Sequence, residues 1–159
     1  MPTVTFTPLT PPHARAVIGW RYEPPYDVYN LHVADVATEA AYMADPSNHY
    51  YSITQGADLI GHAVFYHEAR VPGGDYRADA LDVGWGLHPD MTGRGVGTEI
   101  VAQIMAFGRT QYGARRFRAT VAAWNARGLK VCTNNGFSQA DRFHHLHTGR
   151  EFVILMTGQ

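Results

Sequence analysis

The chain has 159 residues and 45% of them are apolar and spread along its length, so it is long enough to form one domain with its own core. The formal net charge of -1 argues against general nucleic-acid binding, which needs concentrated lysine and arginine. No apolar run of about 18 residues suits a membrane span, and the N-terminus lacks the pattern of a signal peptide. The single cysteine, Cys132, cannot form an internal disulfide, so a reducing, cytoplasmic location is expected.

The first half of the chain predicts strands and helices around one irregular loop. Residues 20–30 cannot form a regular helix, because Pro24-Pro25 interrupts them. Pro72-Gly73-Gly74-Asp75 predicts a hairpin turn. The predicted elements, in order, are a strand at 3–9, a helix from Pro11 to about Ile18, a helix at 37–44, and strands at 49–54, 59–67 and about 79–87.

The second half predicts the main amphipathic helix at 98–112. Ile100, Ile104, Phe107 and Gln111 recur on one side of it, with Val101 and Met105 adjoining, and Gly113 ends it. A strand at 116–121, a helix at 126–134 and strands at 137–143 and 151–157 follow. The whole pattern predicts an α/β (α+β) fold: one domain over residues 1–159, with a mixed, strongly twisted sheet of about seven strands and helices on both faces.

A glycine loop at residues 93–97 joins the predicted strand at 79–87 to the main helix. Such a loop brings backbone N–H groups and the positive end of a helix toward a phosphate, and glycines allow a close approach. A P-loop would end in Gly-Lys-Ser/Thr, whereas Gly97-Thr98-Glu99 has no lysine. The dinucleotide fingerprint would need a glycine in place of Thr98. A plain flexible turn is the alternative.

The spacing of Gly95 and Gly97 is similar to that of the pyrophosphate loop Gln/Arg-x-x-Gly-x-Gly/Ala of the GCN5-related N-acetyltransferase (GNAT) family. Thr92 stands where that motif has glutamine or arginine. A second family pattern, Asn-x-x-Ala-x-x-Leu-Tyr-x-x-x-Gly-Phe, follows after the next strand. Asn125, Gly136 and Phe137 match it, Val131 is a conservative change, and Gly128 and Cys132 depart from it. The chain therefore resembles this family over residues 82–137.

The resemblance implies an enzyme that moves an acetyl group from acetyl-CoA to a primary amine of a small molecule or peptide, with general-base assistance. The pantetheine arm would lie like an extra strand between the fourth and fifth strands. Backbone N–H groups near Gly86 and Leu87 would face the thioester carbonyl, although Gly84 and Gly86 can also be explained by packing beside Trp85. The cofactor-binding residues implied are Leu87, Thr92, Gly93, Arg94, Gly95, Val96, Gly97, Thr98 and Asn125.

Catalysis needs a proton acceptor, because only about one alkyl amine in a thousand is neutral at pH 7. Asp82 lies where many family members carry an acidic residue on the fourth strand, and it is the first candidate. The alternative is an ordinary solvent-facing strand residue. Glu68 and Glu23 are weaker candidates.

The irregular loop at 20–30 combines aromatic rings with carboxylates on a rigid frame, which suits a cationic amine. The alternative is a small satellite core beneath a long loop. The substrate-binding residues expected from this loop and from the third strand are Trp20, Tyr22, Glu23, Tyr26, Tyr29 and Glu68.

Cys132 occupies the place of the family's tyrosine, which protonates the departing CoA thiolate. A thiol can also donate a proton, but free cysteine is often a small buried hydrophobe, so acid catalysis, core packing and a neutral filler near the cofactor sulfur stay open. His144, His145 and His147 form the one histidine cluster and are interpreted as solvated, so no metal is predicted.

Other roles remain possible for the same fold. A non-catalytic acyl-CoA-binding module would keep the glycine loop, and an interaction protein would reuse the fold alone. No nucleic-acid or membrane partner is predicted. The sequence leaves the oligomeric state open, with a homodimer as one possibility.

Overall fold

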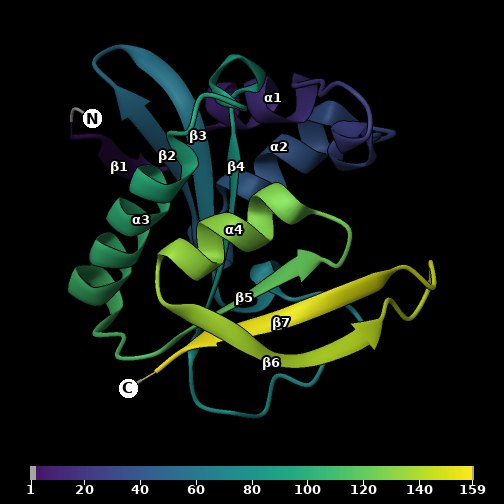
Figure 1. Ribbon diagram of the computed structural model, residues 1–159. Coiled ribbons are helices and arrows are strands. Elements are labelled where there is room, and N and C mark those ends of the chain that lie inside the picture. The colour runs from purple at the N-terminus through teal and green to yellow at the C-terminus, as the bar shows by residue number, and fades with distance from the viewer. Residues whose placement is uncertain (1–2, 159) are drawn as a thin grey trace. The chain divides into compact units, whose positions relative to one another are not determined.

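The computed structural model describes residues 3–158 (Figure 1). The strands are β1(Thr5–Pro8), β2(Tyr50–Gln55), β3(Asp58–Phe65), β4(Leu81–Leu87), β5(Phe117–Ala122), β6(Phe137–His144) and β7(Glu151–Thr157), and the helices are α1(Pro11–Gly19), α2(Val36–Ala44), α3(Gly97–Tyr112) and α4(Ala126–Asn134). The strands form one mixed sheet in the order β1-β2-β3-β4-β5-β7-β6. The predicted α/β fold is therefore confirmed, and most element boundaries fall within two residues of the prediction.

Contacts divide the chain into two compact parts, which are described separately. Within the described residues, the first part comprises the chain up to Val64 together with Trp85–Val96. The second comprises Phe65–Gly84 and the chain from Gly97 onward. Strand β4 contributes its first four residues to the second part and its last three to the first part.

In the first part, β1, β2 and β3 pair antiparallel, and helices α1 and α2 share a core. Helix α1 begins after Thr10, whose side chain accepts a hydrogen bond from the His13 N–H, and Asp35 caps α2 in the same way through Thr38. The buried residues of this core are Leu9, Ala14, Val17, Ile18, Trp20, Ala40 and Met43.

The loop between α1 and α2 contains only a short 3₁₀ turn, η1(Tyr26–Tyr29), as the two prolines predicted. Its apolar residues Val28, Tyr29 and Leu31 are 40–45% exposed. The outer part of this loop is thus open to solvent, whereas Trp20 belongs to the core and Tyr22 and Val33 pack against it.

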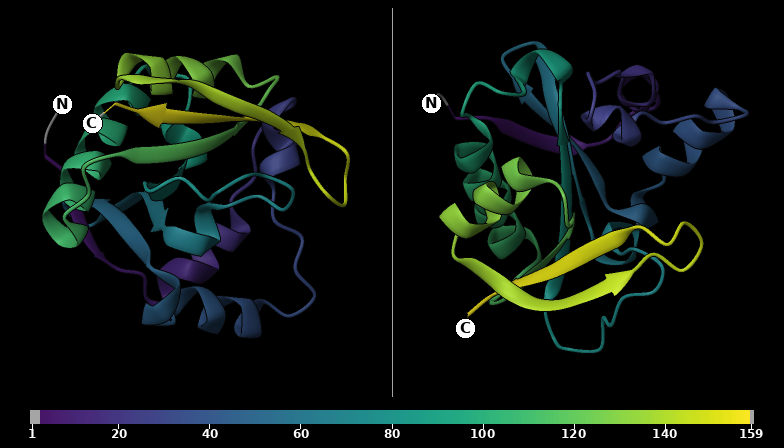
Figure 2. Two further views of the ribbon diagram at one scale, coloured as in Figure 1. Left: turned by 90° about the horizontal axis from the view of Figure 1, so that it is seen from below. Right: turned by 45° about the vertical axis from the view of Figure 1, so that its right-hand side comes forward.

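In the second part, β5, β7 and β6 lie side by side, with the long β6–β7 hairpin in yellow-green and yellow (Figures 1 and 2). The predicted apolar stripe of α3 is buried at Ile100, Val101, Ile104 and Met105. Gln111, predicted on the same side, is exposed. Gly108 is buried on α3 instead. It packs so closely against the Phe117 ring that a Cβ at this position would lie 2.9 Å from a ring carbon.

The predicted hairpin turn at residues 72–75 is wrong as a hairpin. A turn is present, since the Gly74 N–H donates to the Val71 carbonyl, but it lies within a long connection at 66–80. That connection begins with the 3₁₀ turn η3(Tyr66–Ala69), and β4 starts only at Leu81. The glycine and proline signals identified a turn correctly, but they carry no information on which strands flank it.

Candidate active site

The predicted glycine loop adopts a conformation that requires glycine at two places. After β4, the 3₁₀ turn η4(Pro89–Met91) is closed by Thr92, whose hydroxyl donates to the Pro89 carbonyl at 2.8 Å. Gly93 and Gly95 then have φ angles of 74° and 76°, a region that side chains disfavour. A Cβ at Gly95 would meet no atom within 4 Å, so the space beside this backbone is open. The loop is an ordered turn with an accessible backbone.

Helix α3 begins directly after this loop, and α4 holds its first turn in place. The Asn135 side chain donates to the Thr98 carbonyl at 3.1 Å and to the Val131 carbonyl at 2.9 Å. Asn134 donates to the Thr98 hydroxyl at 3.1 Å. Two asparagines at the end of α4 therefore fix the N-terminus of α3, where unpaired backbone N–H groups and a partial positive charge are expected.

Asn125 serves as the cap of α4. Its side-chain oxygen accepts the Gly128 N–H at 2.9 Å. A Cβ at Gly128 would lie 2.8 Å from the Asn125 side-chain nitrogen, so glycine suits the place where the family motif has alanine. The departure at Gly128 is thus explained by the way this carboxamide lies against the helix.

Cys132 is fully buried on α4. Burial raises the pKa of its thiol to about 12, because the charged thiolate loses its hydration. The side chain is therefore neutral at physiological pH and lies in a packed environment even without bound cofactor. These observations fit the packing interpretation and leave acid catalysis as a hypothesis.

Strand β4 pairs with β5 in parallel over only Leu81 and Asp82. The register pairs Leu81 with Phe117 and Asp82 with Arg118, and the ladder between the two strands ends there. A ladder that stops this early is what the proposed insertion of a pantetheine arm after the start of β4 requires.

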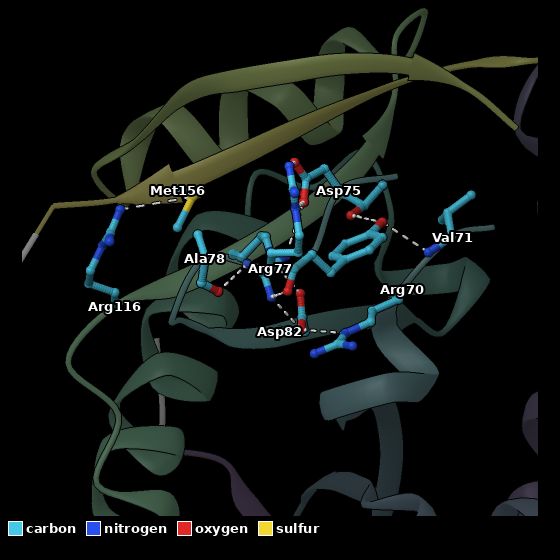
Figure 3. Close-up of polar contacts among 11 residues, drawn as sticks. Arg70, Val71, Asp75, Arg77, Ala78, Asp82, Arg116 and Met156 are labelled. Atoms are coloured by element: carbon cyan, nitrogen blue, oxygen red, sulfur yellow. Dashed lines mark hydrogen bonds and ion pairs between the residues drawn. The ribbon is translucent and has the colours of Figure 1, made fainter. Parts of the chain in front are cut away.

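Asp82 lies at the end of this short ladder and is bound by two arginines. Its carboxylate accepts hydrogen bonds from Arg118 Nε at 2.6 Å and Nη2 at 2.9 Å, and from Arg70 Nε at 2.8 Å. Figure 3 shows the contact between Arg70 and Asp82. Asp82 is 2% exposed and Arg118 is 1% exposed. The alternative that Asp82 is a solvent-facing strand residue is therefore wrong.

The partners of Arg118 complete this network. Its other donors reach the carbonyls of Ala78 and Tyr76, at 2.7 and 3.3 Å, and the Tyr76 ring lies 5.1 Å from its guanidinium carbon. The hydrogen bond to Asp82 raises the pKa of Arg118 above its ordinary value. Both charges are thus compensated, and Asp82 joins β4 to β5 and to the connection at 66–80.

The loop at residues 20–30, which is the predicted acceptor loop, divides into an inner and an outer half. Trp20 is buried, and the Tyr22 hydroxyl donates to the Leu87 carbonyl at 2.7 Å while its N–H donates to the Asn30 side chain. Burial raises the pKa of Tyr22 to about 12, so this phenol is neutral at pH 7. Glu23 and Tyr29 are exposed. Of the predicted substrate-binding residues in this loop, the structure brings Trp20 and Tyr22 next to the end of β4.

Glu68, the candidate from the third strand, lies in η3 and not on β3. Its carboxylate is 3.6 Å from the ring of the neighbouring His67. The side chain is 21% exposed and so is accessible to a ligand.

Sequence reasoning missed two groups of residues. The first is the pair Arg70 and Arg118; a charged residue between apolar neighbours in a strand was the available signal for Arg118. The second is a histidine on β3, His62, whose ring lies 6.1 Å from Trp20 and 6.4 Å from Tyr50. A polar residue within Leu-Ile-Gly-His-Ala-Val was the signal here too.

Within residues 3–158, no group of three or more histidine, cysteine, aspartate or glutamate side chains is arranged to bind a metal ion. Over the same range, no helix combines the length and apolar character needed to cross a bilayer.

Comparisons with known proteins agree with this geometry. The family described as "Acetyltransferase (GNAT) domain" matches residues 3–138. The N-alpha-acetyltransferase RimI of Mycobacterium tuberculosis is 30% identical over 67 residues, which cover 42% of this chain and 40% of that protein. The matched segment thus spans less than half of this relative.

Two groups of solved structures share the fold over almost the full chain. AAC(6')-Ib in complex with ribostamycin and coenzyme A has a TM-score of 0.77 at 16% identity, covering 99% of this chain and 94% of that one. A chimera of spermidine N-acetyltransferase SpeG from Vibrio cholerae and hSSAT has a TM-score of 0.74 at 13% identity, covering 98% and 95%.

Proposed function

Because the chain belongs to the GNAT acetyltransferase family, we propose that it transfers the acetyl group of acetyl-CoA to a primary amine of a small molecule or peptide. The observation that carries this proposal is the loop in which Gly93 and Gly95 take left-handed conformations immediately before α3. Backbone amides at the start of a helix bind phosphate without needing a particular side chain. This explains why Thr92 can replace the usual glutamine or arginine.

The residues present fit acetyl-CoA, which would supply the activated acyl group as a thioester. The open space beside Gly95 leaves its backbone accessible to a phosphate oxygen. Arg94 is exposed within the loop and adds a positive charge. We propose that Leu87, residues 92–98 and Asn125 form the binding site, with Asn125 acting mainly by fixing the start of α4.

An amine is supported as the acceptor by the names of the relatives. RimI is an N-alpha-acetyltransferase, AAC(6')-Ib is an aminoglycoside acetyltransferase, and SpeG is a spermidine N-acetyltransferase. All three names imply attack by a nitrogen nucleophile on an activated acetyl group. In this chain, Trp20 and Tyr22 next to the end of β4, and Tyr26 and Glu23 farther along the loop, are the proposed acceptor-binding residues.

One observation supports the alternative that the chain is a non-catalytic acyl-CoA-binding module. Asp82, the expected general base, already accepts three hydrogen bonds from arginines. If no other group takes the proton, the chain would bind acetyl-CoA without turning it over.

The experiment that tests the proposal combines binding with turnover. Titration with acetyl-CoA is expected to raise the melting temperature, because a ligand that binds only the folded state stabilises it. Release of free CoA thiol is then measured over polyamines, amino acids, aminoglycosides and N-terminal peptides. Thiol release that depends on one class of amine supports the enzyme. Binding without turnover on any amine supports the alternative module, and absence of binding contradicts both.

A further inference from the structure

The imidazole of His62 lies against the last residues of β4. His62 is on β3, and a Cβ at Gly86 would overlap its Nε2. A Cβ at Gly61 would come 2.8 Å from the Gly86 carbonyl oxygen. Glycines at both positions therefore allow β3 and the end of β4 to approach closely, with the histidine ring lying over Gly86. Any other residue at position 86 would displace this ring.

The ring of His62 has one buried polar atom that lacks a hydrogen-bond partner within the described residues 3–158. Its Nδ1 is shielded from solvent and has no partner there. A buried polar atom without a partner typically costs about 1–3 kcal/mol, which an apolar side chain of similar size would avoid. A position that serves packing alone would thus favour leucine over histidine, so the imidazole at this place indicates a role other than packing.

The surroundings of His62 are aromatic. The Trp20 ring follows α1, the Tyr50 ring is on β2, and Ser52 lies opposite His62 in the β2–β3 register. The Ser52 hydroxyl is 2.7 Å from His13 Nδ1, and the His88 ring is 5.3 Å from Trp20. The titratable groups near these rings therefore include Tyr50, His13 and His88, together with Tyr22, whose hydroxyl donates to the Leu87 carbonyl.

Desolvation in this environment lowers the pKa of His62 from 6.5 to about 4. The ring is therefore neutral at physiological pH, and one ring nitrogen carries a lone pair. Because Nδ1 is sealed off, Nε2 over Gly86 is the nitrogen that a ligand at the end of β4 would meet. A neutral ring does not repel a cationic amine, and its lone pair accepts a hydrogen bond from an N–H group.

We propose that His62 accepts the proton of the acceptor nitrogen during acetyl transfer, an inference that rests on the proposed function. The ammonium first releases one proton to solvent water, and the lone pair of the neutral amine then forms the C–N bond to the carbonyl carbon. The C–S bond breaks, and its electron pair leaves with sulfur. The proton lost by nitrogen moves to His62 and then to the thiolate or to water, so the imidazole is regenerated. A weak base suffices, since the nitrogen becomes acidic once it is bonded to carbon.

This role separates His62 from Asp82. The carboxylate of Asp82 is bound by guanidinium groups, whereas His62 has an available lone pair beside the backbone that is proposed to face the thioester. His62 is then a catalytic residue in the strict sense, because it contacts the reacting nitrogen. Asp82 would instead position β4.

The test compares His62→Ala and His62→Gln with the exposed control His144→Ala. Both His62 variants are expected to lose about 100-fold or more in kcat, while acetyl-CoA affinity and the acceptor KM stay within about threefold. Added imidazole is expected to restore part of the kcat of His62→Ala. A purely structural role would not produce such rescue.

Several results would overturn the proposal. One is a kcat within about threefold of wild type in both variants. Another is a folded, CoA-binding His62→Ala protein that loses activity and is not rescued by imidazole. If His62→Ala does not fold, the kcat of His62→Gln decides. If the wild-type protein acetylates no amine, the proposed function itself is overturned, and the role of His62 with it. If the wild-type protein is active and only the results on the His62 variants disagree, the role of His62 alone is overturned.

Discussion

Two polar side chains lie near β4, and their surroundings differ. Asp82, at the start of the strand, is bound by Arg70 and Arg118 and has compensated charge. His62 lies over Gly86, near the end of the strand, and its Nδ1 has no partner within residues 3–158. A buried polar group with all its hydrogen bonds made rigidifies a fold, whereas one left without a partner is costly to stability, so its presence indicates a role other than packing. The comparison therefore assigns structure to the first and chemistry to the second.

The largest effect on stability is expected for Asp82→Asn, which tests whether Asp82 has a structural role. Removing the carboxylate charge leaves Arg118 buried and uncompensated, so we expect a loss of about 3–5 kcal/mol in the free energy of unfolding. Urea denaturation measures it, with Asp75→Asn as control, because Asp75 pairs with Arg77 at the surface and its loss should matter much less. Unchanged stability with a strongly reduced kcat would instead identify Asp82 as the general base.

The pH dependence of stability tests the other side chain of the comparison, His62. The pKa of His62 is lowered from 6.5 to about 4 on folding, so between these values the unfolded chain binds a proton that the folded chain does not. Stability is therefore unaffected at pH 7 and falls as the pH drops from about 6.5 to about 4, by roughly 3 kcal/mol in total. Denaturation is measured at pH 7 and at pH 4. Between these two values, the free energy of unfolding of the wild-type protein should fall by this amount more than that of His62→Gln. Parallel losses in both proteins would mean that His62 is protonated as easily as in water.

A third test compares two glycines with similar backbone conformations, one in the proposed cofactor-binding loop and one outside it. Gly95→Val should weaken acetyl-CoA binding by about 2–4 kcal/mol, because the loop can no longer offer its amides to the phosphates. Gly113 has a φ of 66°, close to the 76° of Gly95, and also faces open space, but it ends α3. Gly113→Val should strain the backbone similarly and leave the dissociation constant unchanged. Calorimetric titration distinguishes the two, and equal affinities in both variants would remove the loop from the binding site.

The Cys132→Ser variant tests whether a buried side chain without charge contributes to stability, as the paired Asp82 carboxylate does. A serine hydroxyl at this fully buried position should destabilise the fold by about 1–3 kcal/mol. Acetyl-CoA affinity should stay within about threefold, or roughly 0.7 kcal/mol, and turnover should fall only modestly. A loss of kcat near that of the His62 variants would show that the thiol donates a proton to the leaving group.

The smallest expected effect concerns the outer half of the acceptor loop. Tyr26→Ala should raise the acceptor KM about fivefold, or ~1 kcal/mol, with little change in the acetyl-CoA KM. Tyr42→Ala on α2, where the tyrosine is 46% exposed, is the matched control. Equal changes in both KM values would indicate that Tyr26 serves packing.

The amino-acid sequence alone determined the element order and the glycine loop before α3. Both depend on signals that are local in the chain: the apolar period of α3, the prolines that interrupt residues 20–30, and the glycines whose left-handed conformations few other residues adopt. The family motif at residues 92–97 is equally local, because phosphate binding at a helix N-terminus needs only a short stretch of backbone. These features could therefore be predicted before any tertiary contact was known.

Only the tertiary structure decided what Asp82 and His62 do. A carboxylate in a strand looks the same in sequence whether it faces water or a guanidinium, and Arg118 is brought to Asp82 by the parallel pairing of β4 with β5. Likewise, the sequence gives no indication that the ring of His62 lies over Gly86 on another strand. The chemistry of a polar side chain depends on its partners and its solvation, and both are set by strand pairing between residues distant in the chain.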